Sequence, residues 1–304
     1  MKEFIKEHLD IANKEGVYEG ITCQEILLNK RVFVERYLPQ AKPSLEIIIY
    51  VGLNILPSSR YFGYFPFNLC KALKTNVSVV YELGCSGRWN RHLRRFTQYE
   101  AEQQFIEGLK IARNFKGKVI IFSHSASTIE HLKLIFEDKY KNFCSGIDIA
   151  GGIMSSTVTN VMLELKRIWP RYKSFNWRHL MQIGKFIDFP LPVYPYYSKA
   201  RHAKNSLMNN LSLWINTKSA EFLLSTNIKK IILNGKYADY PLLALLPRHD
   251  ILFNPSRQEK VYKYISKKAK VDVVKCDAEH NLFLSEDAFH ILKAIKEYVV
   301  KVCG

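Results

Sequence analysis

The sequence lacks most of the features that mark membrane, secreted and metal-binding proteins. No apolar run reaches the roughly 18 residues that a membrane-spanning helix needs, and residues 1–10 mix charges without the apolar centre of a secretory signal. The cysteines form no Cys-x-x-Cys pair and show no metal-ligand spacing; they are Cys23, Cys70, Cys85, Cys144, Cys276 and Cys303. We therefore predict free thiols, a cytoplasmic protein, and neither a metal nor an organic cofactor.

Acidic residues are also scarce: 28 Asp and Glu stand against 45 Lys and Arg, which gives a formal net charge of +17. Such a charge suits an anionic membrane surface, an acidic protein or nucleic acid. Lysine is spread along the whole chain without a dense basic tract, and this argues against nucleic acid. A general bias of composition toward lysine is an equally good reading of the charge.

What the sequence does contain is enough apolar residue to bury a large core, 47% of 304 positions. Apolar strand patterns alternate with amphipathic helix patterns, which is typical of a mainly parallel sheet with helices on both faces. Strands are predicted at 21–28 and 31–38 (a hairpin), 45–51, 77–81, 119–122, 146–150 (closed by two glycines), 241–246 and 271–275. Helices are predicted at 1–19, 64–73, 98–115, 129–136, 256–267 and 285–302.

Residues 154–220 break this alternation. The segment carries ten Lys or Arg against two acids and many aromatic residues. An aromatic, basic insertion between two strands of such a sheet suggests a lid over a binding site, although an ordinary helical excursion with its own small core would look similar. We predict a core of residues 1–153 and 221–304 interrupted by this lid, whose substrate-facing aromatics are Phe175, Trp177, Phe186, Phe189, Tyr194, Tyr196 and Tyr197.

The centre of the chain is the stretch 118–128, in which a buried strand passes into a helix through Ser-His-Ser-Ala-Ser. So short a connection forces a sharp bend, with Ser125 at its tip in strained backbone geometry and small residues two places away on either side. This is the logic of the G-x-S-x-G nucleophile elbow, here with serine in both glycine positions. The alternative is a strand end that simply caps the next helix.

Two further chemical groups follow predicted strands, Asp250 after 241–246 and His280 after 271–275. Catalytic groups of open parallel sheets gather at the carboxyl ends of the strands. Ser, Asp and His also stand in the chain order expected when an elbow supplies the nucleophile.

With these residues the chain resembles an α/β-hydrolase, most closely the group of lysophospholipases, monoacylglycerol lipases and serine aminopeptidases. The resemblance covers about residues 20–302. The matching pieces are Val-Gly-Leu at 51–53 for His-Gly-x, Glu-Leu-Gly-Cys-Ser at 82–86 for Asp-x-Gly-His-Gly, the elbow at 122–127, the acid and proline segment at 241–255, and Glu-His at 279–280.

The resemblance implies acyl transfer to Ser125, with His280 as the base and Asp250 holding its ring. The backbone N–H groups of Ala126 and Leu53 would form the oxyanion hole. A serine nucleophile argues against epoxide-hydrolase or dehalogenase chemistry, which needs a carboxylate at the elbow.

Each of these assignments has a competitor among neighbouring residues. His290 is expected within a helix, His249 beside the acid should point away from it, and His124 should pack behind the nucleophile. Asp239 precedes its strand rather than following it, and Asp148 lies within a strand. Cys85 and Cys276 are expected to be packing residues.

The sequence thus predicts a serine hydrolase of a carboxylic ester or thioester with an apolar acyl group, acting on a small-molecule or lipid-like substrate. The basic lid suggests an anionic head group, an acidic acyl carrier protein or an anionic membrane surface. Two alternatives remain open: an acyltransferase that uses the same three residues, and a non-catalytic ligand-binding protein, because both elbow glycines are missing.

Overall fold

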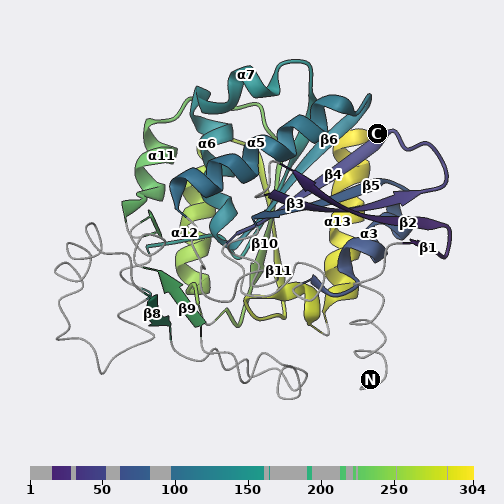
Figure 1. Ribbon diagram of the computed structural model, residues 1–304. Coiled ribbons are helices and arrows are strands. Elements are labelled where there is room, and N and C mark those ends of the chain that lie inside the picture. The colour runs from purple at the N-terminus through teal and green to yellow at the C-terminus, as the bar shows by residue number, and fades with distance from the viewer. Residues whose placement is uncertain are drawn as a thin grey trace.

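The computed structural model describes residues 16–28, 32–52, 62–82, 97–160, 164, 190–193, 213–216, 222–223, 225–250, 252–285 and 287–304. These residues build one large twisted sheet between two helical layers (Figure 1). Predictions that concern other residues lie outside the described part of the chain.

The large sheet has nine strands in the order β1-β2-β3-β5-β4-β6-β7-β10-β11. From β5 to β11 every neighbouring pair is parallel, whereas β1, β2 and β3 join by antiparallel pairing at one edge. The predicted mainly parallel sheet is therefore confirmed. The strands are β1 (Gly16–Tyr18), β2 (Ile21–Leu28), β3 (Val32–Pro39), β4 (Leu45–Val51), β5 (Asn76–Glu82), β6 (Lys118–His124), β7 (Asp148–Ser155), β10 (Leu242–Pro247) and β11 (Val271–Cys276).

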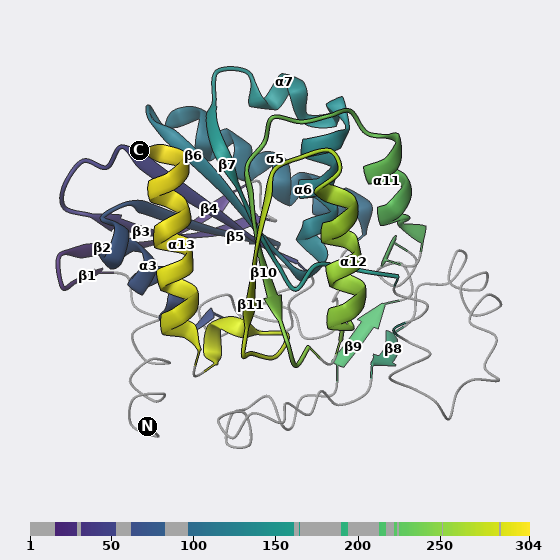
Figure 2. The ribbon, with the colours of Figure 1, turned by 180° about the vertical axis from the view of Figure 1, so that it is seen from behind.

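Helices cover both faces of the sheet, as Figure 2 shows from behind. On one face α3 (Phe65–Leu73) and α13 (Ala288–Cys303) pack into one apolar cluster with the strands. On the other face lie α5 (Gln98–Asn114), α6 (Thr128–Phe136), α11 (Ile228–Asn234) and α12 (Pro255–Ile265). The short helices η1 (Ser125–Ser127), η2 (Asp138–Tyr140) and α7 (Lys141–Cys144) belong to this layer. The short helix η6 (Leu282–Leu284) precedes α13 and packs in the apolar cluster of the opposite face.

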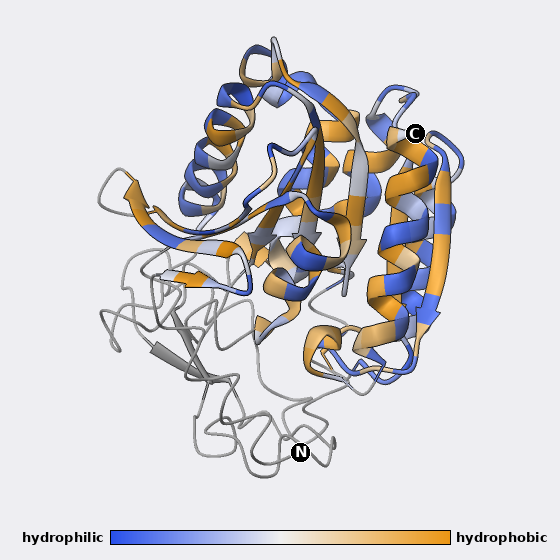
Figure 3. Ribbon diagram, turned by 90° about the vertical axis from the view of Figure 1, so that its right-hand side faces the viewer, coloured by the Kyte–Doolittle hydropathy of each residue, from blue (hydrophilic) through white to orange (hydrophobic). Residues whose placement is uncertain are grey.

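The composition of each element explains its place. All seven residues of β4 are buried, as are Val119 to His124 of β6. Because helices cover both faces of the sheet, its central strands need nearly continuous apolar sequences. The covering helices alternate apolar and polar residues along their length, visible as orange and blue in Figure 3. Pro255 begins α12 directly after Asn254, whose side chain caps the helix by accepting from the Arg257 N–H.

Two of the predicted elements were wrong in part. A helix was expected over 1–19, but residues 16–18 form strand β1, which turns into β2 through Glu19 (φ 48°) and Gly20 (φ 76°). The strand at 146–150 was expected to end at its two glycines, whereas β7 runs through them to Ser155.

The glycines of β7 are needed because helices approach the sheet closely from both sides. A Cβ on Gly151 would lie 2.4 Å from the Tyr298 hydroxyl of α13, and one on Gly152 would lie 2.6 Å from the His131 ring of α6. They mark close packing rather than a turn.

Of the predicted lid, residues 190–193 and 213–216 form a separate two-stranded antiparallel sheet, β8 (Pro190–Val193) and β9 (Leu213–Asn216). The rest of the lid, apart from 154–160 and 164, lies outside the described residues. Among the helices that the structure describes, none combines the length and the apolar character that crossing a membrane requires.

Candidate active site

Three side chains meet just beyond the carboxyl ends of β6, β10 and β11. Ser125 follows β6 directly, Asp250 lies three residues after the end of β10, and His280 lies four residues after the end of β11. Because these strands run parallel in one sheet, their ends share one edge. The structure thus brings together the three residues that the sequence singled out.

Their polar atoms form a continuous chain. The Ser125 Oγ lies 3.1 Å from the His280 Nε2, and the His280 Nδ1 lies 3.0 Å from the Asp250 Oδ2. All three residues are largely buried, with Ser125 the most accessible at 9% exposure. A hydroxyl, an imidazole and a carboxylate in this order can move a proton away from the hydroxyl oxygen.

The bend at Ser125 has the strained geometry that the sequence predicted. Its φ of 57° is in the left-handed region, which non-glycine residues rarely adopt. Gly52, at the end of β4, packs against the next residue: a Cβ at position 52 would lie 2.5 Å from the Ala126 nitrogen. Only glycine allows the β4 loop to approach the start of the elbow helix so closely.

The serines that replace the two elbow glycines are held by hydrogen bonds. The Ser127 hydroxyl, 2.8 Å from both the Tyr50 and His124 carbonyl oxygens, can donate to either and accepts from the His124 N–H at 3.0 Å. The Ser123 Oγ lies 2.7 Å from the His131 Nδ1. Each extra hydroxyl therefore has hydrogen-bond partners, so serine at these two positions leaves no buried hydroxyl unsatisfied.

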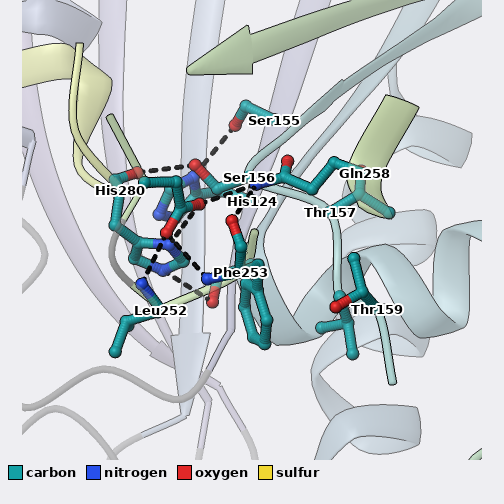
Figure 4. A network of polar contacts seen from close by, with 12 residues as sticks. His124, Ser155, Ser156, Thr157, Thr159, Leu252, Phe253, Gln258 and His280 are labelled. Atoms are coloured by element: carbon teal, nitrogen blue, oxygen red, sulfur yellow. Dashed lines mark hydrogen bonds and ion pairs between the residues drawn. The ribbon is translucent and has the colours of Figure 1, made fainter. Parts of the chain in front are cut away.

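The carboxylate of Asp250 is fixed by neighbours on both sides. Its Oδ1 accepts from the backbone N–H groups of Leu252 at 2.8 Å and Phe253 at 2.9 Å. Its Oδ2 accepts from the Gln258 side chain at 2.8 Å in addition to facing His280. Figure 4 shows the Leu252 and Phe253 backbone and the Gln258 and His280 side chains converging on this point.

His280 is held from its backbone and by ring contacts. The Ser156 hydroxyl, from a residue with φ of 48° just after β7, donates to the His280 carbonyl oxygen at 2.6 Å. The Phe253 ring meets the imidazole edge-on with centroids 5.4 Å apart, and the His124 ring lies 5.2 Å away. These contacts restrict the imidazole to one orientation.

The competing histidines take no comparable part. His124 is fully buried and its Nδ1 lies 2.9 Å from the Ser155 hydroxyl; burial, with a smaller effect of His280, places its pKa well below the usual value. His249 points away to Asp277 on the exposed surface, and His290 lies within α13 beside Asp287.

Of the competing acids and thiols, Asp239 precedes β10 and Asp148 is the exposed first residue of β7. Cys276 is buried, and burial raises its pKa to about 12, as expected for a packing residue. Cys85 lies outside the described residues.

Several predicted site residues belong to the part of the chain that the structure does not describe. Leu53 of the expected oxyanion hole lies outside the described residues, as do all the expected lid aromatics: Phe175, Trp177, Phe186, Phe189, Tyr194, Tyr196 and Tyr197. Ala126 is described and is buried at the start of the elbow helix. In the described part of the chain, no group of three or more His, Cys, Asp or Glu is arranged to hold a metal ion.

Sequence reasoning missed Gln258 and Ser156, which contact the acid and the histidine. Both are ordinary polar residues in the sequence, one within a helix and one after a strand. Only the fold brings them to the site, so no local pattern could have identified them.

No protein-family model matches the sequence, and no curated protein is similar to it. The fold is nevertheless shared with solved structures. A soluble variant of monoglyceride lipase from Saccharomyces cerevisiae, in complex with a substrate analog, has a TM-score of 0.69 at 13% identity, over 95% of this chain and 98% of that one. An esterase from Pyrococcus furiosus has a TM-score of 0.60 at 12% identity, over 93% and 91%.

A third similar structure is Est1E from Butyrivibrio proteoclasticus, with a TM-score of 0.59 at 10% identity, over 92% of this chain and 98% of that one. These structures align with nearly the whole chain, including both sides of the predicted insertion. At such low identity the likeness concerns the fold, and we conclude that this chain has the α/β-hydrolase fold.

Proposed function

We propose that this protein is a serine hydrolase that cleaves a carboxylic ester or thioester through an acyl-enzyme on Ser125. The observation that carries the proposal is the hydrogen-bonded chain from the Ser125 Oγ through His280 to the Asp250 carboxylate, with Ser125 at a strained elbow. A strained, accessible serine beside a buried imidazole and carboxylate has no evident structural purpose.

In the proposed reaction the Ser125 Oγ attacks the acyl carbon while its proton passes to the His280 Nε2. Asp250 keeps the His280 Nδ1–H pointing at its own oxygen and stabilises the imidazolium that forms. His280 then gives the proton to the leaving alcohol or thiol as the bond to the acyl carbon breaks. A water molecule, deprotonated by the same imidazole, then attacks the acyl carbon. The bond from that carbon to the Ser125 Oγ breaks, the imidazolium returns the proton to the Oγ, and the free acid leaves.

The negative charge that develops on the acyl oxygen needs hydrogen-bond donors nearby. We assign this role to the backbone N–H groups of Ala126 and Leu53. Support comes from Gly52, just after β4, which lies so close to Ala126 that a Cβ there would be only 2.5 Å from the Ala126 nitrogen. Two such donors typically account for several kcal/mol of transition-state stabilisation.

For the substrate we propose a small or lipid-like ester with an apolar acyl group. One protein of similar fold is a monoglyceride lipase and another is an esterase, which supports a carboxylic ester as the class. The aromatic composition of the proposed lid, residues 154–220, suits an apolar acyl chain.

The charge of +17 suits an anionic head group, an acidic acyl carrier protein or an anionic membrane surface. If the charge guides the substrate, activity should fall steeply with added salt. Activity that does not respond to salt would remove this part of the proposal. A cytoplasmic site of action fits the five described cysteines, which are all free thiols.

The test is labelling with a fluorophosphonate, followed by mass spectrometry of the wild type beside Ser125→Ala. We expect one adduct on Ser125 and none on the variant, and then hydrolysis of a panel of acyl esters and thioesters of graded length. A folded wild-type protein that never labels at Ser125 would instead support a ligand-binding role.

Acyl transfer would use the same three residues with an alcohol or amine in place of water. Product analysis with and without such an acceptor separates the two reactions. Free acid as the only product, even with the acceptor in excess, supports hydrolysis.

A further inference from the structure

Gln258 is completely buried on α12 and reaches the carboxylate of Asp250. Its Nε2 donates to the Asp250 Oδ2 at 2.8 Å and to the Phe253 carbonyl oxygen at 2.9 Å. Figure 4 shows its side chain extending from the helix toward the group around His280. The Asp250 oxygen that faces the imidazole therefore has a second donor.

The orientation of the Gln258 amide is determined by its two acceptors. Turning the amide over would place its oxygen against the Asp250 carboxylate and against the Phe253 carbonyl, two repulsive contacts. In the orientation observed, the buried Oε1 has no hydrogen-bond partner among the described residues. An amide that leaves its own oxygen unpaired in the interior is placed there for its N–H groups, because unpaired buried polar atoms are costly.

Gln258 also completes the coordination of the carboxylate. Two backbone N–H groups, of Leu252 and Phe253, occupy the Asp250 Oδ1, while Gln258 and His280 share the Oδ2. A carboxylate has about four lone-pair sites in its plane. With three of them filled by the protein, the carboxylate cannot rotate, and the fourth points at the imidazole.

We propose that Gln258 is a positioning residue for the reaction. It holds the Asp250 Oδ2 in the position toward which the His280 Nδ1–H must point, and its N–H partly balances the negative charge on that oxygen. This rests on the proposed function, since it concerns the same three residues. Gln258 acts through Asp250 and does not touch the substrate.

The titratable groups that face this pair from β6 and α12 carry no charge. From β6, His124 faces His280, and burial keeps its pKa well below the usual value. From α12, Tyr262 is buried with its hydroxyl 2.6 Å from the Thr157 hydroxyl, and burial raises its pKa. From η1, the Ser125 hydroxyl faces the imidazole. The charged neighbours along the chain are Glu279, next to His280, and Arg257, next to Gln258, which forms an ion pair with Glu164. A change of charge at 258 acts directly on the Asp250 oxygen that faces His280.

The experiment compares Gln258→Met and Gln258→Glu with the wild type, using p-nitrophenyl butyrate as the substrate. Gln258→Met loses both donors at similar volume, and we expect kcat to fall roughly tenfold with little change in KM, because a hydrogen bond to a charged group is worth at least this factor. Gln258→Glu keeps the shape, but its acid can replace the amide donor only while it holds a proton, because two buried carboxylates this close share one proton. Loss of that proton as the pH rises removes the donor and adds negative charge beside the imidazole, so the kcat/KM profile should gain an ionisation that the wild-type profile lacks.

Tyr262→Phe is the matched control. It removes a buried hydrogen bond from the same helix, one turn further on, without touching Asp250. It should lower the melting temperature while its pH profile stays that of the wild type. If Gln258 had only a structural role, both Gln258 variants would behave like Tyr262→Phe: their melting temperatures would fall and their pH profiles would stay those of the wild type.

A second readout does not depend on activity. In the Ser125→Ala protein, the low-field proton resonance of the His280 Nδ1–H reports its bond to Asp250, and we expect Gln258→Met to shift or broaden it. The inference is overturned if this resonance, kcat and the shape of the pH profile all stay unchanged in the Gln258 variants while Ser125→Ala is inactive. If Ser125→Ala remains active, the proposed function itself fails, whatever the Gln258 variants do.

Discussion

Two pairs of serine and histidine lie near the elbow, and only one of them has the arrangement that the proposed reaction requires. In front, Ser125 faces His280, whose other nitrogen faces Asp250. Behind, Ser123 lies 2.7 Å from the His131 Nδ1, and the His131 Nε2 lies 2.9 Å from the Tyr240 hydroxyl. The serines are two positions apart in the chain, yet Ser123 faces α6 from within β6, whereas Ser125 lies just beyond the carboxyl end of that strand.

The two groups differ in the third residue, which is Asp250 beside His280 and Tyr240 beside His131. Asp250 can stabilise a charged imidazole, whereas a phenol cannot, and burial lowers the pKa of His131 from 6.5 to about 3. His131 therefore stays neutral and ties α6 to the sheet. Ser123 is also fully buried with ordinary strand geometry, while Ser125 reaches solvent from a left-handed residue. A serine beside a histidine is not enough; a carboxylate, access and strain make the difference.

The sharpest test of this comparison exchanges the two serines for alanine. Ser125→Ala should reduce kcat/KM by roughly 10⁴-fold or more, because the nucleophile is lost. Ser123→Ala should leave kcat within about threefold and destabilise the protein by about 1 kcal/mol, the usual net value of one hydrogen bond. Hydrolysis of a model ester and urea unfolding measure both.

Equal losses of activity in the two serine variants would contradict the distinction, provided that both are folded by circular dichroism. Fluorophosphonate labelling gives an independent control, since Ser123→Ala should still label at Ser125.

The next test removes the charge of Asp250, the carboxylate that contacts His280 and has no counterpart beside His131. Asp250→Asn should lower kcat by roughly 10³- to 10⁴-fold, because an amide no longer holds the imidazole in the required tautomer or balances its charge. The pH dependence of kcat measures this. A variant with nearly full activity would show that Asp250 does not act with His280.

The strands that position Ser125, Asp250 and His280 could be predicted from the sequence because each is marked by a local pattern of apolar residues. Buried parallel strands need continuous apolar runs, so 45–51 and 119–122 were recognisable, and β4 has the predicted bounds. Ser125 and Asp250 each follow such a run, and His280 follows the less apolar strand predicted at 271–275. Their meeting then follows from the parallel arrangement alone.

The signals that failed depend on distant parts of the chain. Gly151 and Gly152 look like a strand end, but they are glycines because Tyr298 and His131 press on them from opposite sides. Gln258 has nothing in its neighbourhood to distinguish it from any polar helix residue. The back pair was also invisible, since Tyr240 lies far along the chain from His131 and meets it only in the fold.

The neutral state of His131 predicts how stability depends on pH. Its pKa is near 6.5 in the unfolded chain and about 3 in the folded one, so below pH 6.5 the unfolded state binds the extra proton. Stability from this group is complete above that pH and is lost as the pH falls toward 3. The loss between pH 6.5 and 4.5 should be roughly 2–3 kcal/mol.

His131→Gln isolates this contribution, because glutamine can bond to Ser123 and Tyr240 but does not titrate. We expect the free energy of unfolding in urea to be higher for the wild type than for His131→Gln at pH 6.5, and this difference to be lost at pH 4.5. Ser123→Ala keeps the imidazole and should keep the full pH dependence. A stability difference that is the same at both pH values would refute a neutral buried His131.

The smallest effect on activity is expected from Tyr240→Phe, which removes only the hydroxyl that contacts His131. Burial raises the Tyr240 pKa well above 10, so the hydroxyl keeps its proton and can donate to the His131 Nε2. The Nδ1–H then donates to Ser123. Without the phenol the Nε2 is left unpaired in the interior, at a cost of roughly 1–2 kcal/mol in urea unfolding. Because the change lies behind the elbow, kcat should stay at the wild-type value; a marked fall would mean that the two pairs are coupled through the strand between them.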